Sequence, residues 1–114
     1  MAKRKQRRAR QPAPTSEYTD PEGNVLALRQ ELSRASARKI GERPKSAAAS
    51  IDDAWARREE MLFERLAVSW TVAGLPLDDQ AMLLARYRMA SAEERRWVRE
   101  SIATHLERFI PELA

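Results

Sequence analysis

The chain has 114 residues, no cysteine and a single histidine, and its 21 lysines and arginines outnumber its 17 acidic residues for a formal net charge of +4. Without cysteine it can form no disulfide or thiolate nucleophile, and with one histidine a histidine-based metal site is not expected. No apolar run reaches the roughly 18 residues of a membrane span, and the first residues are too polar for a secretion signal. We therefore expect a small cytoplasmic protein with one folded domain and tails.

The first eleven residues concentrate the positive charge. They hold six bases and no acid, whereas residues 52–114 hold nine bases and twelve acids. The six bases are Lys3, Arg4, Lys5, Arg7, Arg8 and Arg10. Residues 1–16 contain no large apolar side chain after Met1, so they cannot offset the entropy of ordering, and we expect a disordered tail.

This tail is the most distinctive functional feature of the sequence. Each of its bases can displace a counterion from a nucleic-acid backbone, which predicts salt-sensitive and sequence-independent contact with RNA or DNA. Base stacking is not expected, because residues 1–16 have no aromatic side chain. The same charges would also bind an anionic lipid surface or another acidic partner. A tail without any binding role is the third interpretation.

Residues 17–32 have the pattern of a β-hairpin. Pro21 fixes one backbone angle of a turn and Gly23 tolerates a positive φ, while the residues on both sides favour extended structure. An isolated hairpin is marginal in water, so it has to pack on a helix or pair with another chain. Residues 33–49 predict a short polar helix over 33–42 followed by a linker.

Residues 50–114 predict a domain of three helices. The first would run over 51–73, with Ser50 as its cap and Gly74 just past its end. The second would begin at Asp78 or Asp79 and end at Met89. The fold class expected from these elements is mainly α, with a short N-terminal hairpin beside the three-helix domain.

The third predicted helix has the clearest signals at its ends. Ser91 and Glu94 match the S-x-x-E capping box, and Pro111 cannot continue the helix beyond residue 110. Its exposed face mixes acids with arginines, so an ordinary helical hairpin is favoured over a DNA-reading helix-turn-helix. His105 lies at or beside the apolar stripe of this helix, where we expect a boundary histidine with one hydrogen-bond partner.

The second half of the predicted helix 51–73 has an unusually wide apolar arc. Tryptophans at helical spacing are more often core than binding surface, but a small bundle cannot bury every large side chain. The remainder would form a patch for a protein partner or a second copy of the chain. The predicted contact residues are Met61, Val68, Trp70 and Val72.

Catalysis is not expected from this sequence. Three of the four adjacent acidic pairs occupy the first turns of predicted helices, where carboxylates cap and complement the dipole. The fourth, Glu59 and Glu60, faces arginines at helical spacing as a solvated ion-pair surface, and no phosphate-binding or nucleophile motif is present. No catalytic residue, cofactor site or metal site is therefore assigned. We expect a non-enzymatic accessory protein whose helical domain contacts a protein while the tail contacts nucleic acid. The alternative is a purely protein-binding or structural module, homodimeric or not, with an incidental tail.

Overall fold

The structure, a computed structural model, describes residues 14–41 and 51–114, with only the backbone described for residues 51–55. The predicted tail lies outside the described residues as far as residue 13, and the predicted linker lies outside them from residue 42. Thr15 and Ser16, which we assigned to the tail, belong instead to the first strand.

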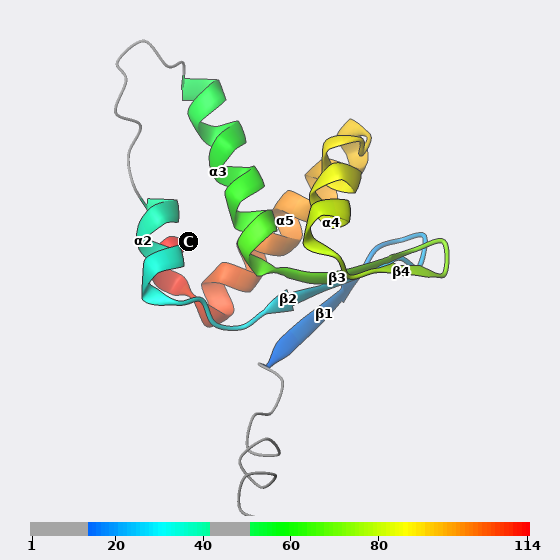
Figure 1. Cartoon of the computed structure of the whole chain (residues 1–114), viewed down its shortest axis with the longest axis horizontal. Coiled ribbons are helices and arrows are strands. Elements are labelled where there is room, and N and C mark those ends of the chain that lie inside the picture. Colours follow the sequence, from blue (N-terminus) through cyan, green and yellow to red (C-terminus); the bar gives the residue numbers. More distant parts are fainter. Residues whose placement is uncertain (1–13, 42–50) are drawn as a thin grey trace, which may run out of the picture.

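Four strands form one antiparallel sheet in chain order (Figure 1). They are β1 (Thr15–Thr19), β2 (Val25–Arg29), β3 (Ala67–Val72) and β4 (Leu75–Leu77). The predicted hairpin is confirmed as β1 and β2, with Thr19 opposite Val25. Its turn is held by the Asp20 carboxylate, whose Oδ1 accepts the backbone N–H groups of Glu22 and Asn24, both at 2.9 Å.

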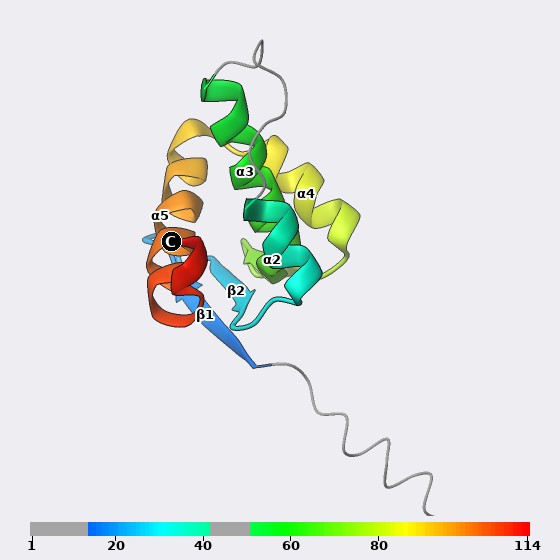
Figure 2. The same ribbon diagram turned by 90° about the vertical axis from the view of Figure 1, so that its left-hand side faces the viewer.

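The helices lie on one side of this sheet (Figures 1 and 2). They are α2 (Arg34–Gly41), α3 (Ile51–Leu66), α4 (Gln80–Arg88), α5 (Ala92–Phe109) and the short 3₁₀ helix η1 (Pro111–Leu113). The predicted capping box of α5 is confirmed: the Ser91 hydroxyl accepts the Glu94 N–H, and the Glu94 carboxylate accepts the Ser91 N–H. Asp79 caps α4 in the same way through the N–H of Met82.

The prediction of a mainly α fold is wrong, because the run 51–73 is not one helix. The helix α3 ends at Leu66, and the next six residues form β3 at the centre of the sheet. Val68, Thr71 and Val72 are β-branched and favour extended structure. The strand that contains them pairs with β2 on one side and with β4 on the other. The protein is a mixed α and β fold, with a four-stranded sheet and helices on one side.

The residues that we read as the end of that helix form a tight hairpin turn instead. Ala73 and Gly74 have positive φ angles of 52° and 81°, and the chain then returns as β4 beside β3. Two successive positive φ angles are the pattern of a two-residue hairpin loop that matches the twist of the strands. The N–H of Ala73 donates to the Asn24 side chain at 3.0 Å, which links this turn to the turn of the first hairpin.

The two faces of the sheet differ in composition. Residues directly opposite one another share a face, and Tyr18, Leu26, Trp70 and Leu77 lie in one such row on the side of the helices. A β-bulge between β2 and β3 leaves Val68 without an opposite residue. On the open face the described side chains are Thr15, Glu17, Thr19, Val25, Ala27, Arg29, Ser69, Thr71 and Pro76, and none of them is aromatic.

The core lies between the sheet and the helices. Its largest fully buried side chains are Trp70, Phe63, Leu26, Leu28, Leu66, His105 and Val98. Phe63 connects two of the layers, because its ring stacks on Tyr87 of α4 at 4.7 Å and meets Trp70 of β3 edge-on at 5.7 Å. Such aromatic pairs add to the stabilisation from buried area alone.

Candidate functional site

The predicted partner interface does not form one helix face. Met61 lies on α3, whereas Val68, Trp70 and Val72 lie on β3. Trp70 is only 1% exposed and is covered by the guanidinium of Arg86, 5.1 Å from its ring centroid. Met61 and Val72 are half-buried against the core and Val68 is half-buried at the bulge. The helix face on which we expected a partner is therefore replaced by a central strand.

Exposed apolar side chains occur on other elements, namely β4, α4 and Met89, the C-cap residue of α4. Among the described residues, three large hydrophobic side chains are mostly exposed: Leu75 at 70%, Met82 at 56% and Met89 at 82%. Met82 and Met89 are seven residues apart, so they lie on the same side of α4, with the exposed Ala85 between them. Leu83 and Tyr87 on the opposite side are buried in the core. The sequence showed apolar side chains around most of this helix, a pattern that could have indicated a second contact surface.

The six bases predicted to contact nucleic acid lie outside the described residues. The chain enters the described part at Pro14 and continues directly into β1, an edge strand of the sheet. The described part itself has thirteen bases and sixteen acids. Several of its arginines pair with acids on neighbouring helices, as Arg88 of α4 does with Glu60 of α3. Its net charge is thus opposite in sign to that of residues 1–11.

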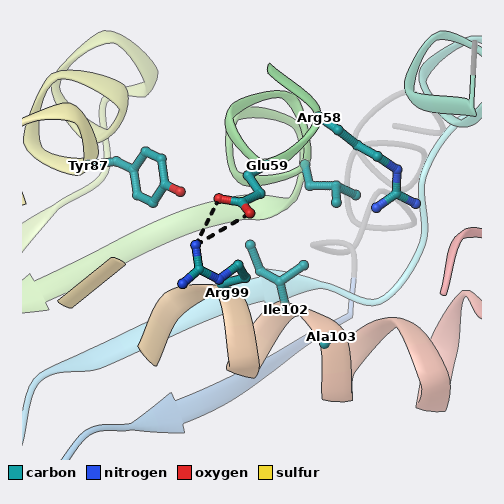
Figure 3. A pocket seen from close by; sticks show the side chains of 7 residues that line it. Arg58, Glu59, Tyr87, Arg99, Ile102 and Ala103 are labelled. Carbon is teal, nitrogen blue, oxygen red and sulfur yellow. Dashed lines mark hydrogen bonds and ion pairs between the residues drawn. The ribbon is translucent and has the colours of Figure 1, made fainter. Parts of the chain in front are cut away.

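A pocket of about 170 Å³ lies between α3, α4 and α5 (Figure 3). Its lining residues are Arg58, Glu59, Leu62, Tyr87, Arg99, Ile102 and Ala103. Leu62 and Ile102 are 3% and 5% exposed, so they form an apolar wall shared with the core. No sequence pattern could have found this pocket, because its residues come from three separate helices.

Three charged residues, Arg58, Glu59 and Arg99, line this pocket, and two of them form an ion pair. The Arg99 Nη1 donates to both carboxylate oxygens of Glu59, at 3.3 and 3.4 Å, and Figure 3 shows the Tyr87 hydroxyl directed towards this pair. Burial raises the pKa of Tyr87, and the Glu59 carboxylate raises that pKa further. The phenol therefore keeps its proton near neutral pH and can donate it to a hydrogen bond. Arg58 donates to the Leu113 carbonyl at 2.5 Å.

His105 is fully buried rather than at the boundary, and it has two hydrogen-bond partners rather than one. Its Nδ1 lies 2.7 Å from the Tyr18 hydroxyl of β1, and its Nε2 lies 2.7 Å from the Arg29 carbonyl of β2. A carbonyl can only accept, so Nε2 carries the proton and Nδ1 accepts from the Tyr18 hydroxyl. Burial lowers the pKa of His105, an effect partly opposed by the bond to Arg29. Both ring nitrogens of the neutral imidazole are satisfied, so His105 fixes β1 and β2 to α5.

The part of the chain that the structure describes contains neither a metal-binding cluster nor a membrane-spanning helix. No three acidic or histidine side chains there come close enough together to hold a metal ion. No helix there is both long enough and apolar enough to cross a lipid bilayer.

The chain matches no protein-family model, no curated protein and no solved structure. Its function therefore has to be argued from its own residues.

Proposed function

We propose that this protein is a small, non-enzymatic accessory protein of the cytoplasm that holds nucleic acid through residues 1–11 and contacts a protein partner through its folded domain. The observation that carries the proposal is the separation of charge along the chain. Residues 1–11 contain six bases and no acid, whereas the described part has three more acids than bases. Nucleic acid would be attracted to the first region and repelled by the second.

The position of the tail on the fold supports this division. Residue 13 is followed at once by β1, which begins away from α4 in both views of the molecule (Figures 1 and 2). The described chain thus begins at a point away from the exposed side of α4. The open face of the sheet favours a backbone-binding mode over base recognition, since its described side chains include no aromatic ring on which a base could stack.

The proposed protein contact is supported by the exposed methionines of α4. Met82 and Met89 lie on one side of this helix and are mostly exposed, although α4 already buries Leu83 and Tyr87 on its other side. Flexible methionine side chains suit surfaces that pack against a partner. This feature also supports the second candidate function, a purely protein-binding module in which the tail has no role.

The experiment is a fluorescence-anisotropy titration of labelled RNA and DNA duplexes with three forms of the full chain. The first is the natural protein, and the second carries Arg4→Gln, Arg7→Gln and Arg10→Gln in the tail. The third is a matched control that removes the same charge from exposed positions of the folded part, by Arg34→Gln, Arg57→Gln and Arg96→Gln.

We expect the tail variant to bind about tenfold more weakly or worse, because each lost phosphate contact lowers the affinity, and the control variant to bind like the natural protein. Equal weakening of both variants would contradict a tail-specific contact. No binding by any form would favour the purely protein-binding module. Binding to phosphatidylserine vesicles but to neither duplex would make the tail a lipid-surface anchor instead.

A further inference from the structure

The pocket between α3, α4 and α5 combines an apolar wall with charges of both signs, which none of the functions proposed above uses. Glu59 and Arg99 lie beside one another at 3.3 Å, next to the buried side chains of Leu62 and Ile102. A ligand that matches this arrangement needs an anion, a cation and an apolar body close together.

The Glu59–Arg99 pair, between α3 and α5, is weaker in geometry than the neighbouring Glu60–Arg88 pair, between α3 and α4. Arg99 uses a single nitrogen, Nη1, for both of its long contacts with Glu59. Arg88, in contrast, uses two nitrogens to bind both oxygens of Glu60, at 3.0 and 3.1 Å. A guanidinium has five N–H donors, so Arg99 keeps donor capacity for a second carboxylate.

Tyr87 adds a second donor to the pocket. Its ring is held by stacking on Phe63, and its hydroxyl points towards Glu59 and Arg99 (Figure 3). Among the described residues this hydroxyl has no hydrogen-bond partner, and burial keeps it protonated by raising the pKa of Tyr87. A ligand carboxylate could thus receive hydrogen bonds from Arg99 and Tyr87, while Glu59 accepts from a ligand ammonium group.

The size of the pocket limits the ligand. A dry apolar cavity of about 150 Å³ holds benzene, which has six carbon atoms, and this pocket measures about 170 Å³. Its wall of Leu62, Ile102 and Ala103 suits a short aliphatic side chain. A nucleotide or larger cofactor would extend out of this pocket into solvent.

We propose that this pocket binds a free α-amino acid with a small apolar side chain. Its carboxylate contacts Arg99 and Tyr87, its ammonium group contacts Glu59, and its side chain packs against Leu62 and Ile102. A simple carboxylic acid would place its charge beside Glu59 without compensation, and a simple amine would do the same beside Arg99. This site does not include the tail, so the proposed amino-acid binding is tested separately from the proposed contact with nucleic acid.

Calorimetric titration of the full chain with three probes tests the proposal. The probes are L-leucine, 4-methylpentanoate, which lacks only the amine, and 3-methylbutylamine, which lacks only the carboxylate. We expect leucine to bind at least about tenfold more tightly than either analogue, since each analogue leaves one charged partner without its hydrogen bonds. Absence of leucine binding at millimolar concentration, or an analogue that binds as tightly as leucine, would overturn the proposal.

A set of variants assigns any binding to this pocket. Glu59→Gln and Arg99→Gln should each weaken leucine binding at least about tenfold, whereas Glu60→Gln and Arg88→Gln, in the neighbouring ion pair outside the pocket, should leave it unchanged. Tyr87→Phe keeps the stacked ring and removes only the hydroxyl, so a weaker affinity in this folded variant would identify the hydroxyl as a ligand contact. Equal loss in the Glu60 and Arg88 variants, or full affinity in Arg99→Gln, would overturn the proposal.

Discussion

The two regions of this chain differ in how many acids accompany their arginines. In the described part, Arg86, Arg88 and Arg99 each pair with a glutamate of another helix, so their charge is used to hold helices together. Residues 1–11 contain six bases and no acid, so the tail has no opposite charge of its own. The contrast shows that total charge says little about binding, because a neighbouring carboxylate offsets the charge that an arginine presents to a polyanion.

The largest expected effect is a loss of folding free energy on replacing Trp70, and it tests whether the tail binds nucleic acid independently of the folded domain. Trp70→Ala should cost about 3–5 kcal/mol of folding free energy, because it empties a site at the centre of the core. Met89→Ala, at a side chain that is 82% exposed, is the control and should cost little. Denaturant unfolding followed by circular dichroism measures both variants.

Nucleic-acid affinity should survive Trp70→Ala even under conditions in which the domain is unfolded, since the proposed contacts lie in residues 1–11. If affinity disappeared together with the fold, the separation between the two regions would be wrong. Trp70→Phe is a useful intermediate, because the Trp70 Nε1 is buried without a hydrogen-bond partner among the described residues, so phenylalanine removes an unsatisfied group.

The next prediction concerns the pH dependence of the domain. The pKa of His105 is lowered in the folded protein from its ordinary value of 6.5, chiefly by burial, so the unfolded chain binds more protons as the pH falls. The stability that His105 contributes is therefore complete above 6.5 and is lost as the pH falls from there towards the lower folded pKa.

Urea unfolding at about pH 7.5, 6.5 and 5.5 measures this effect, in a range above the ordinary titration of carboxylates. His105→Gln should unfold with a smaller pH dependence than the natural protein over the same range. Tail binding should barely change there, because lysine and arginine do not titrate near neutral pH. If the natural protein had the same free energy of unfolding at the lowest and the highest of these pH values, the assignment of His105 as a buried, neutral side chain would be contradicted.

A smaller effect is expected from the ion pair between α4 and the start of α5. Arg86 donates to Glu94 at 2.6 Å with both side chains about a quarter exposed. The Ser91 N–H and Arg86 together lower the pKa of Glu94. Because solvent screens such pairs, Arg86→Gln should cost about 0.5–1 kcal/mol, and Arg88→Gln at the more exposed pair should cost less. Thermal unfolding of both variants gives the order, and a larger loss from Arg88→Gln would contradict it.

An effect of similar size but opposite sign distinguishes the observed hairpin from the helix that we predicted. Ala73 has a φ of 52°, which is unfavourable for alanine and accessible to glycine. Ala73→Gly should therefore raise stability by about 0.5–1 kcal/mol. In a helix that continued through residue 73 the same change would lower stability by a similar amount. A higher melting temperature of the variant would therefore support the hairpin turn, and a lower one would support the continuous helix.

Local signals in the sequence were enough to predict several elements. The turn chemistry of Asp20–Asn24 identified the first hairpin, and the pair Ser91 and Glu94 identified the start of α5. These elements depend on hydrogen bonds between residues a few positions apart, which a sequence displays directly.

The prediction failed where the fold depends on contacts between distant residues. The run 67–72 contains enough apolar side chains to fit either a helix or a strand, and only pairing with β2 about forty residues earlier decides for the strand. The same change moved Trp70 from a predicted interface into the core. Two other features also join residues that are far apart in the chain. They are the contacts of His105 with Tyr18 and Arg29 and the pocket between three helices, and no local residue spacing in the sequence predicted them.

The most direct test of the division between tail and domain is the salt dependence of nucleic-acid binding by the full chain. If all six tail bases contact phosphates, the logarithm of the association constant for duplex DNA should fall with the logarithm of salt concentration at a slope near −5, about 0.9 for each charge. The variant with Arg4, Arg7 and Arg10 replaced by glutamine should show about half that slope. A slope near zero, or the same slope in both proteins, would contradict a nucleic-acid contact carried by the tail.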